Sequence, residues 1–175
     1  MSGSRTSSPP AARVSKGCRV AADTPSAAPL RLRAEDAEDL AVISACLQDA
    51  LVAIRDLAYD AGERTFMLVA NRFRWENGAA FPERVLCGIA FSAIEAVSYR
   101  GFRRAEEDRI LCLLAVRFDS AATAEPGRNA IRLEFSDGAE IRLASVGLRC
   151  HARDLGEPWP TAWQPDHVID EPASG

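Results

Sequence analysis

Apolar residues recur at two different spacings along the chain, and the change of spacing predicts where a helix gives way to strands. The helical spacing is carried by Leu40, Ile43, Leu47 and Leu51. It follows the acidic run 35–39, whose carboxylates suit the positive end of a helix dipole, so we expect an amphipathic helix over about residues 36–50. Residues 30–33 alternate between apolar and basic side chains, which predicts a short strand before that helix.

A spacing of two dominates the rest of the chain and is typical of strands. The expected strands lie at 54–59, 65–75, 85–91, 94–99 (continuing the one before it after a bend), 110–118, 131–135 and 140–143. The first two flank the turn-forming residues 60–63 and predict a β-hairpin, and the apolar run 110–118 predicts a strand buried on both faces. Residues 146–155 fit either a strand that ends at Asp154 or a short helix, and the strand is favoured.

The clearest hairpin surrounds residues 136–139, and its side chains predict a register. The favoured register pairs Phe135 with Ile141 and Leu133 with Leu143. It keeps apolar partners on one face and sets Glu134 opposite Arg142. This pairing requires a loop of odd length.

Residues 155–167 contain two of the three tryptophans and three of the ten prolines. Proline lacks a backbone N–H and fixes φ, so this segment is predicted to be neither a helix nor a central strand. We expect an extended segment whose indoles, Trp159 and Trp163, lie across an apolar surface and close a sheet edge or one end of the core. Exposed to water, the same residues would instead form a partner-recognition motif.

These elements together predict an α+β fold. One N-terminal amphipathic helix packs on a mostly antiparallel twisted sheet, or half-barrel, of about six or seven strands, and a pleckstrin-homology-like arrangement is one form of it. Residues 30–168 are expected to form this single globular domain. Residues 1–29, rich in Ser, Ala and Pro, are expected to be a disordered N-terminal extension, and residues 169–175 a C-terminal tail.

Charge limits the classes of partner. Residues 1–29 carry a formal charge of +3, so the total of −4 leaves −7 for the remainder of the chain. An anionic domain is a poor match for nucleic acid and for an anionic membrane surface, and we expect it to bind neither. A protein or a small molecule is the expected partner, and no cofactor is predicted.

The five cysteines are odd in number and include no pair at a zinc-binding spacing. They resemble the reduced thiols of a cytoplasmic protein. Cys150 and His151 with the distant His167 are the one group that resembles a soft-metal or Cys/His catalytic set. Neighbouring strand residues point to opposite faces, so we predict no metal and no catalytic residue. No apolar run is long enough for a membrane-spanning helix, and no signal peptide is expected.

Three polar residues on or beside the predicted helix are candidates for a binding site. They are Ser44, Gln48 and Asp49. These side chains could contact a ligand, or they could hydrogen-bond the backbone of the neighbouring hairpin. The second interpretation is favoured, because buried polar side chains mostly serve backbone groups.

Two arginines are a further candidate for ligand binding. Arg72 and Arg74 alternate with Phe73 and Trp75, so a strand would present two guanidinium groups on one face. They could bind phosphate or carboxylate groups. The favoured interpretation is a solvent-facing pair that is neutralised by local acids such as Glu76.

Three blocks of sequence also occur together in a known family. The blocks are Ala34 to Ala45 with Gln48-Asp49-Ala50, then Asn71-Arg72-Phe73-Arg74-Trp75-Glu76, then Asp154-Leu155-Gly156 running into Pro158-Trp159-Pro160 and Trp163. Over residues 30–167 the chain resembles the bacterial family catalogued as domain of unknown function 2948. The resemblance implies a single-domain bacterial cytoplasmic protein with a dispensable N-terminal extension. It implies no reaction, cofactor or catalytic residue.

The sequence contains no glycine-rich phosphate loop, metalloprotease motif or nucleophile elbow. We therefore predict a non-enzymatic binding or adaptor module. Its candidate contact residues are Ser44, Gln48, Asp49, Arg72, Arg74, Trp159 and Trp163. The alternative is a small enzyme or ligand sensor with a pocket between helix and sheet, lined by Ser44, Gln48, Asp49 and Arg72.

Overall fold

The computed structural model describes residues 28–77, 82–120 and 129–162. Predictions made for residues 1–27, for Trp163 and His167 and for the C-terminal tail lie outside these residues. The described elements are β1 (Arg31–Ala34), α1 (Ala37–Cys46), β2 (Ala50–Ala53), η1 (Ile54–Asp56), β3 (Leu57–Asp60), β4 (Thr65–Phe73), η2 (Trp75–Asn77), β5 (Glu83–Phe91), β6 (Ile94–Arg100), β7 (Ile110–Asp119), β8 (Asn129–Phe135), η3 (Ser136–Gly138), β9 (Glu140–Ser145) and β10 (Cys150–Pro160).

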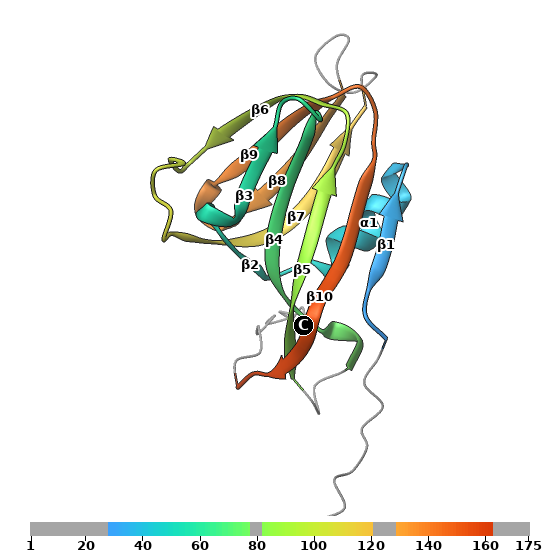
Figure 1. The fold of residues 1–175 in the computed structure, drawn as a ribbon, viewed down its shortest axis with the longest axis vertical. Coiled ribbons are helices and arrows are strands. Elements are labelled where there is room, and N and C mark those ends of the chain that lie inside the picture. Colours follow the sequence, from blue (N-terminus) through green and yellow to red (C-terminus); the bar gives the residue numbers. More distant parts are fainter. Residues whose placement is uncertain (1–27, 78–81, 121–128, 163–175) are drawn as a thin grey trace, which may run out of the picture.

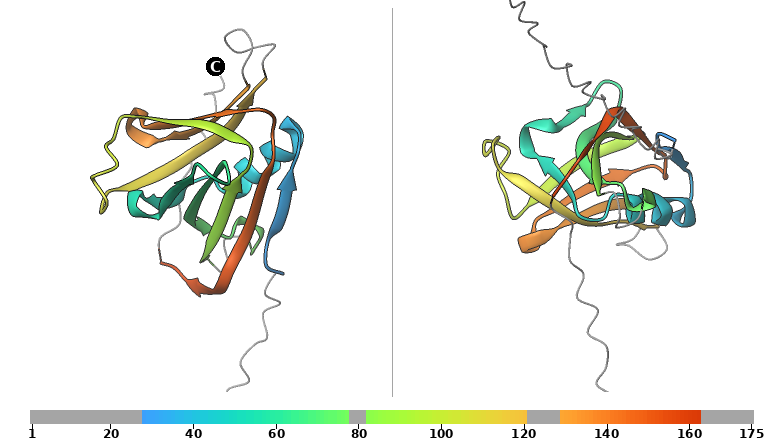
Figure 2. Two further views of the ribbon diagram at one scale, coloured as in Figure 1. Left: turned by 45° about the horizontal axis from the view of Figure 1, so that its top comes forward. Right: turned by 90° about the horizontal axis from the view of Figure 1, so that it is seen from below.

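The strands form one sheet of ten strands, in which every described pair is antiparallel. They follow one another in the order β1, β10, β5, β4, β2, β7, β8, β9 and β6, and β3 pairs with β4. The sheet curls so that β3, β4, β5 and β10 face β6, β7, β8 and β9, as Figures 1 and 2 show. The short strand β2 joins the two halves, because Leu51 lies opposite both Asn71 and Cys112.

The predicted α+β class with about six or seven strands is wrong, because the protein is mostly β. Two features of the backbone account for the additional strands. The chain bends at Ala93, which has a φ of 60°, so that β6 leaves β5 and pairs with β9 instead of continuing the same strand. Ala50, assigned to the end of the helix, and Leu51, assigned to its apolar spacing, belong to β2 instead.

The core lies between the two halves of the sheet, and α1 contacts β1 and β7 at its side. The helix begins at Asp36, whose carboxylate accepts the backbone N–H of Asp39 at 2.8 Å. Its predicted apolar residues Leu40, Ile43 and Leu47 are buried. The helix ends at Cys46 rather than at about residue 50, because Asp49 has a φ of 59° and turns the chain into β2.

Strands β8 and β9 form the predicted hairpin, but the predicted register is wrong. Leu133 lies opposite Ile141, and Ile131 lies opposite Leu143. Apolar partners therefore still share one face, and the loop is of odd length with the three residues of η3. Asp137 and Gly138 have φ values of 59° and 71° there. Both residue types tolerate positive φ, so the tighter turn is favoured over the longer loop.

This register sets Glu134 opposite Glu140 rather than opposite Arg142. Two arginines on neighbouring strands offset the repulsion, since Arg117 lies 3.0 Å from Glu134 and Arg100 lies 3.0 Å from Glu140. Each glutamate is therefore neutralised by an arginine on the neighbouring strand outside the hairpin. A prediction from the hairpin alone did not include these arginines.

The tryptophan-proline segment begins as part of β10, which the sequence did not predict. β10 lies between β1 and β5, and its register with β5 shifts between Leu155 and Trp159. Gly156 has a φ of 74° at this irregularity. The two prolines are tolerated because β1 pairs only with residues 150–153, so the end of β10 has a strand on one side only.

Candidate functional site

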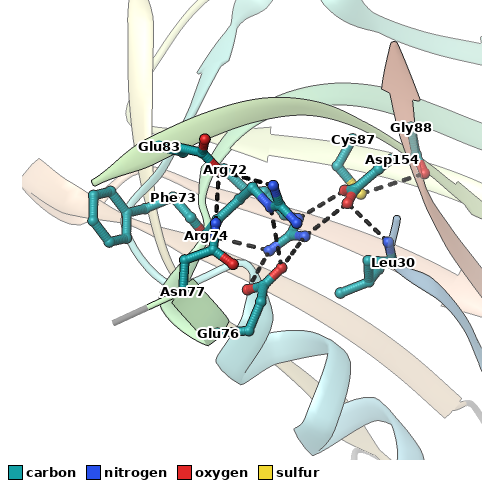
Figure 3. Close-up of polar contacts among 10 residues, drawn as sticks. All are labelled: Leu30, Arg72, Phe73, Arg74, Glu76, Asn77, Glu83, Cys87, Gly88 and Asp154. Atoms are coloured by element: carbon teal, nitrogen blue, oxygen red, sulfur yellow. Dashed lines mark hydrogen bonds and ion pairs between the residues drawn. The ribbon is translucent and has the colours of Figure 1, made fainter. Parts of the chain in front are cut away.

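Arg72 is the centre of a buried group of charges at one end of the core (Figure 3). It lies near the end of β4, and its side chain is fully buried. Its Nε and Nη2 donate to Oδ1 and Oδ2 of Asp154 at 2.8 and 2.7 Å. Its Nη1 and Nη2 donate to Oε2 and Oε1 of Glu76 at 3.1 and 2.7 Å. Two carboxylates thus hold one guanidinium group, each through a pair of bonds.

Arg74 extends this group and is 2% exposed. Its Nη1 donates to Oε2 of Glu83 at 2.8 Å, and its Nε lies 3.5 Å from Oε1 of Glu76. Nδ2 of Asn77 donates to the same oxygen of Glu83 at 2.6 Å. The expected pairing with Glu76 occurs, whereas the expectation that both arginines face solvent is wrong. We call Arg72, Arg74, Glu76, Glu83 and Asp154 the charge cluster.

Asp154 and Glu83 are members of the charge cluster that the sequence interpretation missed. Asp154 lies on the inward face of β10, two residues after buried Ala152, and its side chain is 2% exposed. Its Oδ2 also accepts the backbone N–H of Leu30 at 2.9 Å. A carboxylate at an apolar position of a strand indicates a buried cation, and this was the available signal. The sequence did not show that the cation is Arg72.

The ion pairs keep these groups in their charged forms. Burial by itself lowers the pKa of Arg72, but its hydrogen bonds to Asp154 and Glu76 raise that pKa above its usual range. Burial by itself raises the pKa of Asp154 and of Glu76, but the hydrogen bonds from Arg72 lower both. Groups that remain charged over the physiological pH range are poor proton donors and acceptors in catalysis.

The thiols among the described residues are not activated. Burial raises the pKa of Cys87 and of Cys150 to about 12. Burial also raises the pKa of Cys46 and of Cys112. A nucleophilic or metal-binding cysteine needs a lowered pKa, so these four side chains behave as packed thiols.

A cavity of about 250 Å³ lies beside the charge cluster. Its lining includes Arg74, Asp154 and Val85, together with Pro29 before β1 and Pro158 near the end of β10. The walls are largely aliphatic, and two of the charged groups, Arg74 and Asp154, are engaged in ion pairs, whereas Glu157 lies at the edge. This cavity holds one of the predicted residues, Arg74.

The three candidate residues near the helix lie in different surroundings and do not form one site. Oγ of Ser44 accepts the backbone N–H of Val116 at 2.8 Å, in line with the favoured interpretation. Gln48 is exposed. The carboxylate-bearing Asp49 is 8% exposed, and its backbone N–H donates to the carbonyl of Leu113 at 2.8 Å. None of the three lines the cavity beside Arg74.

The remaining predicted candidates lie on β10. Trp159 is opposite Arg84 and is 37% exposed, so its indole is only partly packed on the fold. Cys150 is buried and His151 is exposed, as expected for neighbouring residues of a strand. Within the described ranges, no group of three or more His, Cys, Asp or Glu side chains could hold a metal ion.

The side of β2, β3, β4 and β5 that faces away from the core has an apolar middle, and Asn71 of β4 and Arg84 of β5 lie at one end of it. The apolar residues, called the outer face, are Leu51, Ala53, Ala58, Met67, Val69, Leu86, Gly88 and Ala90. Met67 is 40% exposed and Leu86 is 41% exposed. The solvent side of an antiparallel sheet is ordinarily polar, so this face departs from the usual alternation.

A hollow of about 350 Å³ lies over the outer face. Small residues, Gly88, Ala58 and Ala90, are part of its lining, and the side chain of Leu155 lies against Gly88. The sequence contained a signal, because residues 85–91 include no polar side chain on either side of the strand.

Among the described residues, no helix has the length and apolar character needed to span a bilayer. Comparison with known families gives one match, to the family described as "Protein of unknown function (DUF2948)", over residues 30–167. No curated protein and no solved structure matches the chain.

Proposed function

Because the chain belongs to the DUF2948 family of unknown function, we propose from its geometry a non-enzymatic binding module whose outer face contacts a partner protein. The observation that carries this proposal is the apolar character of a sheet face that water reaches. Met67 and Leu86 are each about two-fifths exposed on it, and Ile110 at its border is 60% exposed. Contiguous apolar surface of this kind marks interaction sites.

The state of the polar groups supports binding rather than catalysis. Arg72, Asp154 and Glu76 hold one another in their charged forms, and burial raises the pKa of all four described thiols. An acid–base catalyst needs a group that changes its protonation near neutral pH, and a thiol nucleophile needs a lowered pKa. Free thiols also suit a reducing compartment, and we propose the bacterial cytoplasm as the location.

A photo-crosslinking residue at Met67 tests the proposal directly. The same residue at Leu114 is the matched control, because Leu114 is 48% exposed on β7, away from the outer face. We expect irradiation of intact cells to give one discrete adduct to a second protein chain from position 67 and none from position 114. The urea midpoint of both substituted proteins should equal that of the wild type, because both side chains already face water.

Two results would contradict the binding module. One is the same diffuse labelling, or none, from both positions. The other is that purified protein turns over a compound from a broad substrate panel, and that this activity is lost when residues of the charge cluster are substituted and the outer face is unchanged. An adduct between two copies of this chain would identify the partner as a second copy.

The cavity beside Arg74 favours one second candidate, a ligand sensor. Its volume of about 250 Å³ is near the lower end of small-molecule sites. A compound that raises the melting temperature of the wild type, but not that of Glu157→Arg at the edge of the cavity, would support this candidate. Equal shifts for both proteins would exclude binding in this cavity.

A further inference from the structure

We infer that the partner of the outer face is a protein segment in which a large apolar side chain lies next to acidic residues. This inference rests on the proposed function and adds the chemistry of the partner. It is carried by four exposed residues beside the outer face, which we call the basic row. The basic row consists of Arg31 and Arg33 of β1 with His151 and Arg153 of β10.

The basic row and the outer face share the same cross-strand rows of the sheet. One row runs from Arg31 through Arg153 and Gly88 to Val69. A second row runs from Arg33 through His151, Ala90 and Met67 to Ala58. Residues paired in this way point to the same face. Neighbouring strands are about 4.8 Å apart, so the backbone of Arg153 lies about one strand spacing from Gly88 in the lining of the hollow.

The basic row is costly to the free protein. Like charges directly opposite one another destabilise a sheet, and here Arg31 faces Arg153. Elsewhere the sheet offsets such a pair, since Arg132, opposite Arg142, lies 2.7 Å from Asp119.

Within the described residues, no acidic side chain forms an ion pair with Arg31 or Arg153, and Arg33 pairs with Glu35. No negative charge in the described fold therefore offsets the repulsion between Arg31 and Arg153. A bound carboxylate would supply that negative charge beside the hollow that Gly88 lines.

The hollow decides between the classes of anionic partner. The arginines by themselves could bind nucleic acid or an anionic membrane. The neighbouring hollow is concave and apolar, however, and it fits one inserted side chain better than a flat bilayer. The charge of −7 carried beyond residue 29 also disfavours polyanions. Asp56 lines the hollow on the side away from β10. It repels carboxylates, so the acidic residues of the partner are directed towards the basic row.

A random peptide library displayed on phage tests this inference with the full chain. Phage are selected on the wild type, and those that also bind the variant Val69→Arg are removed. This variant places a charge in the hollow, so the remaining phage depend on the hollow for binding. We expect the selected peptides to combine a large apolar residue with Asp or Glu. The double variant Arg31→Glu/Arg153→Glu should bind these peptides about tenfold more weakly, because attraction becomes repulsion at two exposed positions.

Selection on the double variant should yield Lys or Arg in place of the acids. Arg142→Glu is the control, because Arg142 is also an exposed arginine opposite another arginine but lies on β9. Its affinity for the selected peptides should equal that of the wild type. Circular dichroism and urea midpoints verify that every variant is folded.

The outcomes separate this inference from the proposed function. Peptides that depend on Val69 but ignore the double charge reversal would overturn the acidic partner and leave the binding face in place. Failure to select any peptide that depends on Val69 would count against both. Tighter binding by a single-stranded oligonucleotide or by phosphatidylserine vesicles would assign the site to another occupant and overturn the inference.

Discussion

Replacing Arg72 by methionine should be among the most destabilising single changes in the described residues. Methionine is close to arginine in length but carries no charge, so Asp154 would remain 2% exposed with the N–H of Leu30 and the thiol of Cys87 as its nearest partners and without its ion pair to Arg72. Removing one partner of a buried ion pair typically costs about 3–5 kcal/mol of unfolding free energy. The substitution leaves Glu76 less destabilised than Asp154, because the side chain of Glu76 is 34% exposed and water can hydrate its carboxylate.

The double variant Arg72→Met/Asp154→Leu removes both buried charges, so we expect it to lose less stability than Arg72→Met alone, below about 2 kcal/mol. The exposed pair of Arg117 and Glu134 gives the control. Arg117→Met should cost less than about 1 kcal/mol, because exposed ion pairs contribute little. Urea unfolding followed by circular dichroism measures all three values.

The pH dependence gives a second and independent readout. In the wild type the pKa values of Asp154 and Glu76 are lowered, so their contribution is present above the ordinary carboxyl pKa and is lost as pH falls through the lowered values. In Arg72→Met the remaining effect on Asp154 is mainly burial, which raises its pKa. The folded variant then takes up a proton more readily than the unfolded chain and gains stability as pH falls.

The stability deficit of Arg72→Met should therefore be smaller at about pH 5 than at about pH 7.5. A deficit below about 1 kcal/mol, or one that is the same at both pH values, would refute the assignment of Arg72 and Asp154 as a buried charge pair.

Four further predictions follow from single contacts. Ser44→Ala should cost about 1 kcal/mol in urea unfolding, because it removes the acceptor of the Val116 N–H, and exposed Ser98→Ala should cost less; equal losses would contradict this. Trp159→Ala should cost about 2 kcal/mol, less than a fully buried tryptophan, because the residue is 37% exposed; a wild-type midpoint would show that the indole is not packed. Cys87 and Cys150, with pKa values raised to about 12, should resist an aromatic disulfide reagent until the protein is unfolded, and mass spectrometry would detect any earlier reaction. Deleting residues 1–27 should leave the melting temperature unchanged because the backbone bond of Leu30 to Asp154 is kept, and a decrease of several degrees would show that the segment stabilises the fold.

Local pattern predicted the strands well where one face enters the core. Val85, Cys87, Ile89 and Phe91 alternate along β5, and all four are buried. Alternation fails where both faces are apolar or where a strand is very short. Leu51 falls by chance on the helical spacing but belongs to β2, and the run 110–118 is not buried on both faces, since Ile110 and Leu114 are exposed.

The candidate site was less accessible to sequence reasoning because its partners are distant in the chain. Arg72 was selected as a candidate, but its bonds to Asp154 join residues that are 82 apart, and the sheet order brings them together. The basic row has the same origin. Arg31 and Arg153 become neighbours only when β10 enters between β1 and β5, and no local spacing indicates that insertion.

The position of β10 in the sheet also has a consequence for synthesis on the ribosome. Leu30 and Asp154 are 124 residues apart, and β1 has no other strand partner among the described residues. During translation β1 emerges early and stays unpaired, while β5 keeps one edge open, until β10 leaves the exit tunnel. Such an edge recruits other chains. Folding is therefore completed after most of the chain has been made, and until then the open edge of β5 is the part of the sheet most exposed to pairing with other chains.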